Sequence, residues 1–490
     1  MAVPEHIRAV ERPTNTVVYA YGKNKDRYAV KTRLGCRYEK GKNPKPINGP
    51  TIGYIIDGKF VPKEEKKESK IAQSNIDLKD WANIELCNNL MKELQQELEE
   101  IYCHEDALKI YCIALLRVCY PGIKDYELGE AYKRSFLSEL YPNVALSRNT
   151  VSKFLNDLGK TCSRIIKFMK KRAQRVSSDE HILIDGTLKS NESKVNSLAD
   201  FSRKARTKNT RDISLIYAFN LEKMEPICSK CYPGNMLDVT AYADFIQENA
   251  ISKGIIVADK GFPAKAAQKK FDENPDLHYL NPIKRNSKFI ETHQLLHFTN
   301  MLIGFSGIAY KKAKCNGTNK WLYSFRDAKI AAIEEQEYFA KAQKNRTYNH
   351  EDFCKKQKSF GTIVLECDLN LDAETIYKAY SQRWEIELVM RFYKSACCFD
   401  ETRVHDDYSV IGSEFCDFLS TAFTFKLINT FDSKKILEKM TYKKVMSILK
   451  RAKKVRINEG AWQLIKINPS HEELLQNLDL LPRPEMSLRK

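Results

Sequence analysis

The sequence predicts an α/β protein of several domains, because strand-like and helix-like segments alternate through its central part. Three short apolar runs are typical of strands: HILIDGT, DISLIYAFN and GIIVADKGF. A helix-like stretch, PAKAAQKKF, and another strand candidate, LHYLNPIKR, follow the third run. Strands that alternate with helices imply an α/β core. The length of 490 residues favours more than one domain.

Residues 1–75 are expected to form a small basic β module followed by a charged connector. The first 60 residues are rich in Gly, Pro, Asn and Lys. Three β-like runs, TVVYAY, DRYAVKTRLG and TIGYIIDGKFVP, are separated by turn-like stretches such as KGKNPKPINGP.

Residues 76–178 predict a helical region. Two stretches, LMKELQQELEEIY and EDALKIYCIALLRVCY, carry apolar residues at spacings of three and four. A further helix is expected in VALSRNTVSKFLNDLGK, with Ser147 as its N-cap and Gly159 at its end. This helix resembles the second helix of a helix-turn-helix, and an ordinary amphipathic helix in a bundle fits the pattern equally well. The polar side chains that would face DNA are Arg148, Asn149 and Lys153.

The α/β core is expected in two pieces, residues 179–285 and 361–425, separated by an insertion at 286–360. The insertion contains FSGIAYKKAK and KWLYSFRD on either side of Asn316-Gly317, which predicts a β-hairpin. The strand pattern resumes in GTIVLECD, and LDAETIYKAYSQRWEIELVMRFYK follows as a long helix that begins near Asp372. Residues 426–490 are expected to be a C-terminal helical region.

The charge balance favours a polyanionic partner. Lys and Arg number 81 against 63 Asp and Glu, a formal net charge of +18. Nucleic acid is the simplest partner for such an excess, with an anionic membrane surface as the weaker alternative. No stretch of about 18 apolar residues predicts a membrane span, and no signal peptide is expected. A structural zinc site at Cys228 and Cys231 is not expected, since it would need two more distant ligands.

One helix stripe suggests chemistry on phosphate. At about 100° per residue, Tyr380, Arg383, Glu387 and Lys394 would fall within an arc of roughly 60°. Cations around a single carboxylate suit a metal-bound phosphodiester, because the carboxylate holds the metal and the cations neutralise phosphates. A solvated helix face with a Glu/Arg ion pair is the alternative.

Two aspartates complete a possible metal site. Asp185 and Asp259 each end an apolar run, which is where an open α/β sheet presents functional groups. With Glu387 they would supply hard oxygen ligands for a pair of Mg²⁺ or Mn²⁺ ions. Each aspartate by itself would also fit a turn or a helix cap.

Taken in chain order, these residues resemble the IS4-like group of DDE insertion-sequence transposases. The resemblance is carried by Asp185-Gly186-Thr187, Asp259-Lys260-Gly261-Phe262 and Tyr380-x2-Arg383-x3-Glu387-x6-Lys394. PGNMLD at 233–238 and RWEIE around Arg383 also look like the group. The resemblance covers roughly residues 180–425.

The resemblance implies an RNase H-like catalytic core with a β-rich insertion. It implies that Asp185, Asp259 and Glu387 hold two Mg²⁺ or Mn²⁺ ions per active site, and that Tyr380, Arg383 and Lys394 contact phosphates near the transposon end. Trp321 in the insertion would be the candidate for stacking on a flipped base, although a hairpin core aromatic is the favoured alternative. Trp384 is expected to pack.

The function implied is that of a DNA transposase. It would bind double-stranded DNA at the terminal inverted repeats of its element, cleave the strand and join the freed 3′-OH to target DNA. A homodimer on DNA is expected, because two ends need two active sites, and no small-molecule substrate is expected. The expected location is cytoplasmic and nucleoid-associated. The alternatives are a nuclease with the same core, such as a domesticated relative, and a DNA-binding regulator.

Overall fold

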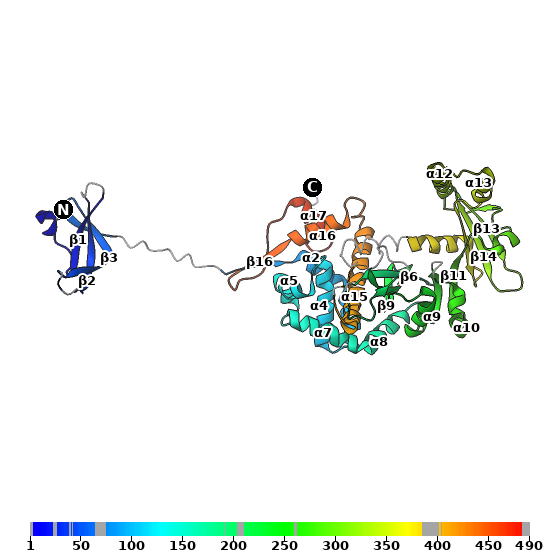
Figure 1. Cartoon of the computed structure of the whole chain (residues 1–490), viewed down its shortest axis with the longest axis horizontal. Coiled ribbons are helices and arrows are strands. Elements are labelled where there is room, and N and C mark those ends of the chain that lie inside the picture. Colours follow the sequence, from blue (N-terminus) through cyan, green and yellow to red (C-terminus); the bar gives the residue numbers. More distant parts are fainter. Residues whose placement is uncertain are drawn as a thin grey trace, which may run out of the picture. The chain divides into compact units, whose positions relative to one another are not determined.

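The computed structural model of the chain divides into two compact units, Met1–Asn75 and Ile76–Lys490 (Figure 1). The described residues are 3–22, 27–38, 41, 43–63, 75–191, 193–202, 210–258, 262–384, 401–402 and 404–482.

The first unit is a four-stranded antiparallel sheet. Its strands follow chain order: β1 (Thr16–Tyr21), β2 (Arg27–Arg37), β3 (Lys45–Ile56) and β4 (Lys59–Pro62). Val18, Val30 and Ile55 form a small core with Ile7 of α1 (Glu5–Arg8). The first two β-like runs lie largely in β1 and β2, and the third contains the end of β3, a turn and β4. β3 also takes in KPINGP, which the sequence predicts as a turn, and register shifts between β2 and β3 accommodate it.

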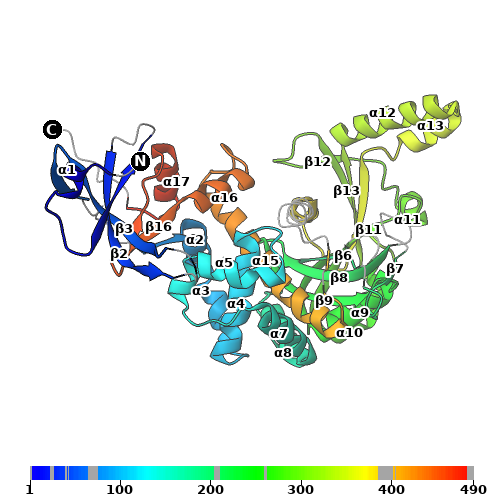
Figure 2. The ribbon, with the colours of Figure 1, turned by 60° about the vertical axis from the view of Figure 1, so that its left-hand side comes forward.

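The second unit begins with the expected helices. They are α2 (Ala82–Leu90), α3 (Lys92–Glu99), α4 (His104–Cys119), η1 (Asp125–Glu127), α5 (Leu128–Arg134), α6 (Leu137–Leu140), α7 (Arg148–Lys160) and α8 (Cys162–Ala173). α4 is buried along most of its length. It lies beside the long helix α15 (Asp407–Ser433), as both views of the ribbon show (Figures 1 and 2).

The centre of the second unit is a mixed sheet. Its core strands are β6 (His181–Ser190), β8 (Arg211–Asn220), β9 (Glu225–Pro233), β10 (Lys253–Ala258) and β11 (Asp276–Ile283). Across the sheet they run in the order β9-β8-β6-β10-β11. β8 is antiparallel to β6 and β9, whereas β10 is parallel to β6 and β11. α9 (Asp238–Glu248) connects β9 to β10, and η2 (Ala264–Ala267) with α10 (Gln268–Glu273) connects β10 to β11. The two-residue β7 (Asp200–Phe201) adds to β8.

The insertion extends the same sheet. β15 (Thr362–Cys367) pairs antiparallel with β11, and β14 (Trp321–Asp327), β13 (Ile308–Lys314) and β12 (Asn300–Met301) follow in order. β13 and β14 form the expected hairpin, and Gly317 in its turn has a φ of +74°. The insertion also contains the helices α11 (Lys288–Thr292), α12 (Ala328–Asn345) and α13 (His350–Gln357), which the charged sequence there did not predict. α12 and α13 share a small cluster of Ala331, Phe353 and Phe360.

The C-terminal region is not purely helical. Besides α16 (Tyr442–Arg451) and α17 (Pro469–Asn477), it contains β16 (Lys453–Ile457) and β17 (Gln463–Leu464). β16 pairs with β5 (Ile76–Asp80), at the start of the unit, in a separate sheet of order β17-β16-β5. The expectation of helices alone fails here because the strand's partner is far away in the sequence. Within the described part of the chain, no helix has the length and apolar character to cross a membrane.

Candidate active site

Asp185 lies in the middle of β6, not at its end. It is opposite Tyr217 of β8, and the strand continues to Ser190. The apolar run ends at Ile184, but β6 continues to pair with β8 as far as Ser190. This is possible because the later polar side chains have partners of their own, as Lys189 has in Glu414. Asp185 is half-buried, and the Gly186 N–H donates to its Oδ1 at 2.9 Å.

The two aspartates each follow a residue that belongs to the same pair in the register of β6 and β10. Ala258, the last residue of β10, is the partner of Ile184. The next residue in the chain after Ile184 is Asp185, and the next after Ala258 is Asp259. Asp259 itself lies outside the described residues, as do Glu387 and Lys394.

The predicted stripe begins on a helix, as expected. Residues 373–384 are helical, and Asp372 caps the helix by accepting the Thr375 N–H at 2.8 Å. Hydrogen bonds from Thr375 also lower the pKa of the Asp372 carboxyl. Tyr380 and Arg383 lie together: the guanidinium carbon is 4.9 Å from the ring centroid, and Nη2 is 3.5 Å from the hydroxyl. In Figure 1 this helix, drawn in yellow, extends from β13 and β14 in the direction of β6.

A pocket of about 600 Å³ lies between this helix and strands β11, β14 and β15. Tyr380, Arg383 and Trp384 line it from the helix. From the sheet side, Arg285 makes a bidentate pair with Glu334 at 2.8 and 3.0 Å and also donates to the Thr362 carbonyl. Trp384, which the sequence suggested would pack, lines the pocket with 52% of its surface exposed.

Trp321 begins β14 and is half-buried. Its strand neighbours are Lys314 and Cys367, and it packs on the main core. The ammonium groups of Lys312 and Lys314 lie 4.8 and 6.0 Å from the indole centroid. These contacts match those of a hairpin core aromatic, and stacking on a base stays a prediction.

Helix α7 presents the three predicted DNA-facing residues to solvent: Arg148, Asn149 and Lys153 are exposed. Ser147 caps the helix, since its Oγ accepts the Thr150 N–H at 3.4 Å. The opposite face of α7 packs closely on α15. A Cβ at Gly159 would lie 1.8 Å from the Tyr408 carbonyl oxygen, and one at Gly412 would lie 2.1 Å from that of Leu155. Contact between α7 and DNA stays a prediction.

The sequence did not predict a buried network of charges that joins β6, α4 and α15. Lys189 Nζ lies 2.6 Å from Glu414 Oε2 and 2.8 Å from Asp417 Oδ2, both on α15. Arg117 of α4 lies 2.8 Å from Asp417 Oδ1 and 2.9 Å from Asp125. Burial raises the pKa of Glu414, and the Lys189 ammonium opposes that rise. No local spacing could have found the network, because Lys189 and Asp417 are 228 residues apart.

Asp185 and Lys189 lie on the same face of the sheet, since side chains two and four apart along a strand share a face. Tyr217, opposite Asp185, stacks on Phe418 of α15 with centroids 6.3 Å apart. α15 therefore covers the face to which Asp185 belongs, and the network fixes β6 against it.

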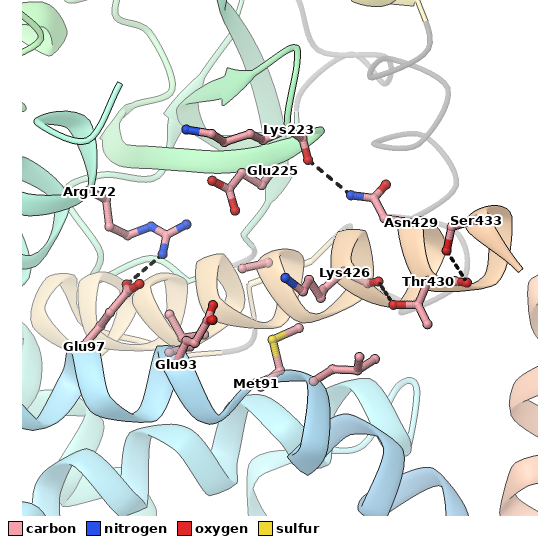
Figure 3. A pocket seen from close by; sticks show the side chains of 13 residues that line it. Met91, Glu93, Glu97, Arg172, Lys223, Glu225, Lys426, Asn429, Thr430 and Ser433 are labelled. Carbon is pink, nitrogen blue, oxygen red and sulfur yellow. Dashed lines mark hydrogen bonds and ion pairs between the residues drawn. The ribbon is translucent and has the colours of Figure 1, made fainter. Parts of the chain in front are cut away.

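A second pocket, of about 530 Å³, lies where α3, α8 and α15 meet the turn between β8 and β9 (Figure 3). Charges of both signs line it. Arg172 is paired with Glu97 at 2.8 Å, and Asn429 donates to the carbonyls of Lys223 and Met224. None of the predicted site residues that the structure describes line this second pocket, which lies at the junction between the helical region and the sheet.

Within the described ranges no three His, Cys, Asp or Glu side chains gather as a metal site would require. Asp185 is the single described member of the predicted triad. The three predicted ligands are all carboxylates, which is the oxygen donor type that Mg²⁺ and Mn²⁺ prefer.

A protein-family model matches the part of the chain that carries these residues. Residues 177–409, a little under half of the chain, match the family model "Transposase DDE domain". The matched range contains Asp185, Asp259 and Glu387 and runs from just before β6 into the start of α15. No curated protein matches the chain significantly.

Two solved structures resemble the chain weakly. One is a piggyBac transposase synaptic complex with hairpin DNA, at 13% identity and a TM-score of 0.40, covering 75% of this chain and 79% of that one. The other is a Mos1 transposase paired-end complex with the left transposon end, at 12% identity and a TM-score of 0.15, covering 32% and 58%. The comparison therefore depends on the match of residues 177–409: this part of the chain is similar to transposase DDE domains, which supports a metal-dependent enzyme that cleaves DNA and transfers its strands.

Proposed function

We propose that this enzyme is the transposase of an IS4-like insertion sequence. It binds the terminal inverted repeats of the element, cleaves at their ends and joins the ends to target DNA. The observation that carries the proposal is the register of β6 and β10, in which Ile184 and Ala258 are partners and an aspartate follows each.

The order and direction of the strands support an RNase H-like core. β6 is central, β8 and β9 form an antiparallel meander on one side of it, and β10 and β11 are parallel on the other. We assign this core to residues 179–285 and 361–425, with 286–360 as its insertion. Residues 76–178 are assigned to DNA binding, with Arg148, Asn149 and Lys153 as contacts.

The proposed metal ligands are Asp185, Asp259 and Glu387. When bound, a pair of Mg²⁺ or Mn²⁺ ions would supply Lewis-acid stabilisation to the phosphodiester oxygens. The protein contributes a half-buried Asp185 whose carboxylate is oriented by the Gly186 N–H. The buried contacts of Lys189 with α15 hold the strand that carries it.

The reaction has two in-line displacements. In the first, a water oxygen attacks phosphorus, the P–O3′ bond breaks, and the element's strand is left with a 3′-OH. In the second, that 3′-OH loses its proton and attacks a phosphodiester of target DNA, and a target 3′-OH leaves. Arg383, held against Tyr380, and Lys394 would offset negative charge on the phosphates near the cut.

The proposed partner is double-stranded DNA, in keeping with the net charge of +18. A homodimer is proposed because a complete event cuts two ends. We place the reaction in the cytoplasm, at the nucleoid.

The test uses the full chain and labelled duplexes taken from the DNA that flanks its coding sequence. Asp185→Asn and Glu387→Gln should each abolish cleavage and leave duplex binding largely intact. Matched controls are Asp272→Asn, an exposed aspartate on α10, and Glu337→Gln on α12, whose side chain is 62% exposed. Both controls should cleave like the wild type. Cleavage that survives in Asp185→Asn would contradict the assignment.

The alternatives give different products. A nuclease of the same core would cut the duplex without joined strand-transfer products. A DNA-binding regulator would bind the ends and cut nothing in Mg²⁺ or Mn²⁺. Inverted repeats that bracket the coding sequence would support the transposase.

A further inference from the structure

The first unit, to which the proposed function assigns no role, has one face that is not used for its core. Directly opposed residues of antiparallel strands share a face. Val18 is opposite Val30, and this pair belongs to the buried side. The other side, here called the tyrosine face, consists of Val17, Tyr19, Tyr21, Arg27, Ala29, Lys31, Tyr54, Ile56, Lys59 and Val61.

Three tyrosine rings lie on this face. Tyr19 and Tyr21 are on β1, with 37% and 42% of their surface exposed, and Tyr54 is on β3. The rings of Tyr21 and Tyr54 have centroids 6.0 Å apart. Asn48 donates a hydrogen bond to the Tyr19 hydroxyl, which fixes the position of that ring. Ile56 and Val61 add 52% and 42% exposed apolar surface, so the face is a contiguous amphipathic platform.

Cations surround the rings. Arg27 is opposite Tyr21, Lys59 is opposite Ile56, and the Lys31 ammonium lies 5.5 Å from the centroid of Tyr19. None of the ten residues of the face is acidic. Residues 1–63 as a whole contain 13 Lys and Arg against 5 Asp and Glu. This charge selects a polyanion as the occupant of the face.

We propose that the tyrosine face binds single-stranded DNA. Exposed aromatic rings on a sheet stack on unpaired bases, while neighbouring cations neutralise the backbone. A duplex hides the flat faces of its bases and offers only edges and backbone, which would leave the tyrosine rings unused. DNA is the committed nucleic acid because residues 177–409 of the same chain match a transposase DDE domain, and this choice rests on the proposed function of DNA cleavage.

Affinity is measured first, on the full chain, by fluorescence anisotropy with a labelled oligothymidine of about 20 nucleotides. Tyr19→Ser and Tyr21→Ser should each weaken binding roughly tenfold, because each removes one stacking ring. Tyr21→Phe, which keeps the ring, should bind like the wild type, and this excludes a general loss of folding. Tyr348→Ser is the matched control, since Tyr348 is 53% exposed in the second unit and lies outside the residues assigned to DNA binding.

The salt dependence tests the cations. Lys31→Gln should reduce the slope of log affinity against log salt by about 0.7, the value for one phosphate contact to a single strand. An unchanged slope would show that Lys31 does not contact a phosphate of the bound strand. Tyrosine variants that bind like the wild type would overturn the proposal.

The location is tested by photocross-linking. An oligothymidine with 5-iodouracil substitutions is irradiated with the full chain, and the cross-linked peptide is identified by mass spectrometry. Cross-links to Tyr19, Tyr21 or Tyr54 are expected, and cross-links confined to residues 76–490 would overturn the proposal. An oligouridine RNA of the same length and a blunt duplex serve as competitors. Tighter binding of the RNA, or equal competition by the duplex, would also overturn the commitment to single-stranded DNA.

Discussion

Replacing Lys189 by Met tests whether the buried network holds β6 in place. The side chain is 3% exposed, and its ammonium is shared by Glu414 and Asp417, which are 4% and 8% exposed. Met is unbranched like Lys and only one heavy atom shorter, so it fills most of the same space but removes the charge. The change leaves the Glu414 carboxylate without its cation, while Asp417 keeps the ion pair with Arg117.

The size of the effect follows from burial. Removal of one partner of a buried pair costs about 3–5 kcal/mol, because an uncompensated charge is left behind. Since Arg117 still neutralises Asp417, we expect the lower end, about 3 kcal/mol. That is a large part of the roughly 5–15 kcal/mol by which a folded protein is stable.

The cost should depend on pH. The pKa of Glu414 is raised by burial, and the ammonium of Lys189 opposes the rise, so the pKa in Lys189→Met is higher still. A carboxyl whose folded pKa exceeds its unfolded pKa gives stability below the unfolded value, which is lost as pH rises through the folded value. Near pH 5 the carboxyl can stay protonated, so the deficit of the variant should be smaller there than near pH 8.

The assay is urea unfolding of the full chain near each pH, followed by circular dichroism. Lys133→Met is the matched control: its side chain is 73% exposed and pairs with Glu130 on the helix surface, so it should change stability by less than about 0.5 kcal/mol. A deficit below about 1 kcal/mol, or one that is equal at the two pH values, would refute the reasoning.

Three further predictions concern the helices. Gly412→Ala should destabilise the second unit by at least about 2 kcal/mol in the same urea assay, because its Cβ would lie 2.1 Å from the Leu155 carbonyl oxygen; wild-type stability would mean that α7 and α15 separate easily. Arg383→Gln should lower the salt slope of end binding by about 0.9 in a filter-binding titration, and an unchanged slope would remove the phosphate contact. Lys153→Gln should give a similar loss for ends and for unrelated duplex, since a phosphate contact carries no sequence information; a loss for ends alone would indicate base recognition.

Local signals in the sequence predicted much of the fold. Ser147 caps α7, Asn316-Gly317 turns the hairpin, and Tyr380 and Arg383 share one helix face as their spacing required. Each of these features is decided by residues within a few positions of one another.

The features that were missed depend on distant partners. β6 runs past Asp185 because Lys189 is neutralised by α15, and β16 is a strand because β5 is there to pair with it. α12 and α13 were not predicted because their sequence is highly charged and they bury only a small cluster of apolar side chains between them. For the site, the sequence predicted Asp185 at the end of a strand, whereas it lies in the middle of β6, and Asp259, Glu387 and Lys394 lie outside the described residues.

The pairing of β5 with β16 has a consequence for synthesis of the protein. β5 ends at Asp80 and β16 begins at Lys453, so a ribosome that adds about 5–20 residues per second needs on the order of 20–75 s between them. Throughout that time β5 is an unpaired strand on the nascent chain. Its sequence, IDLKD, places charges at three of five positions, which discourages pairing with other chains. β5 is therefore an exposed edge strand until the last part of the chain has been made, and its own charged residues protect that edge from pairing with other chains.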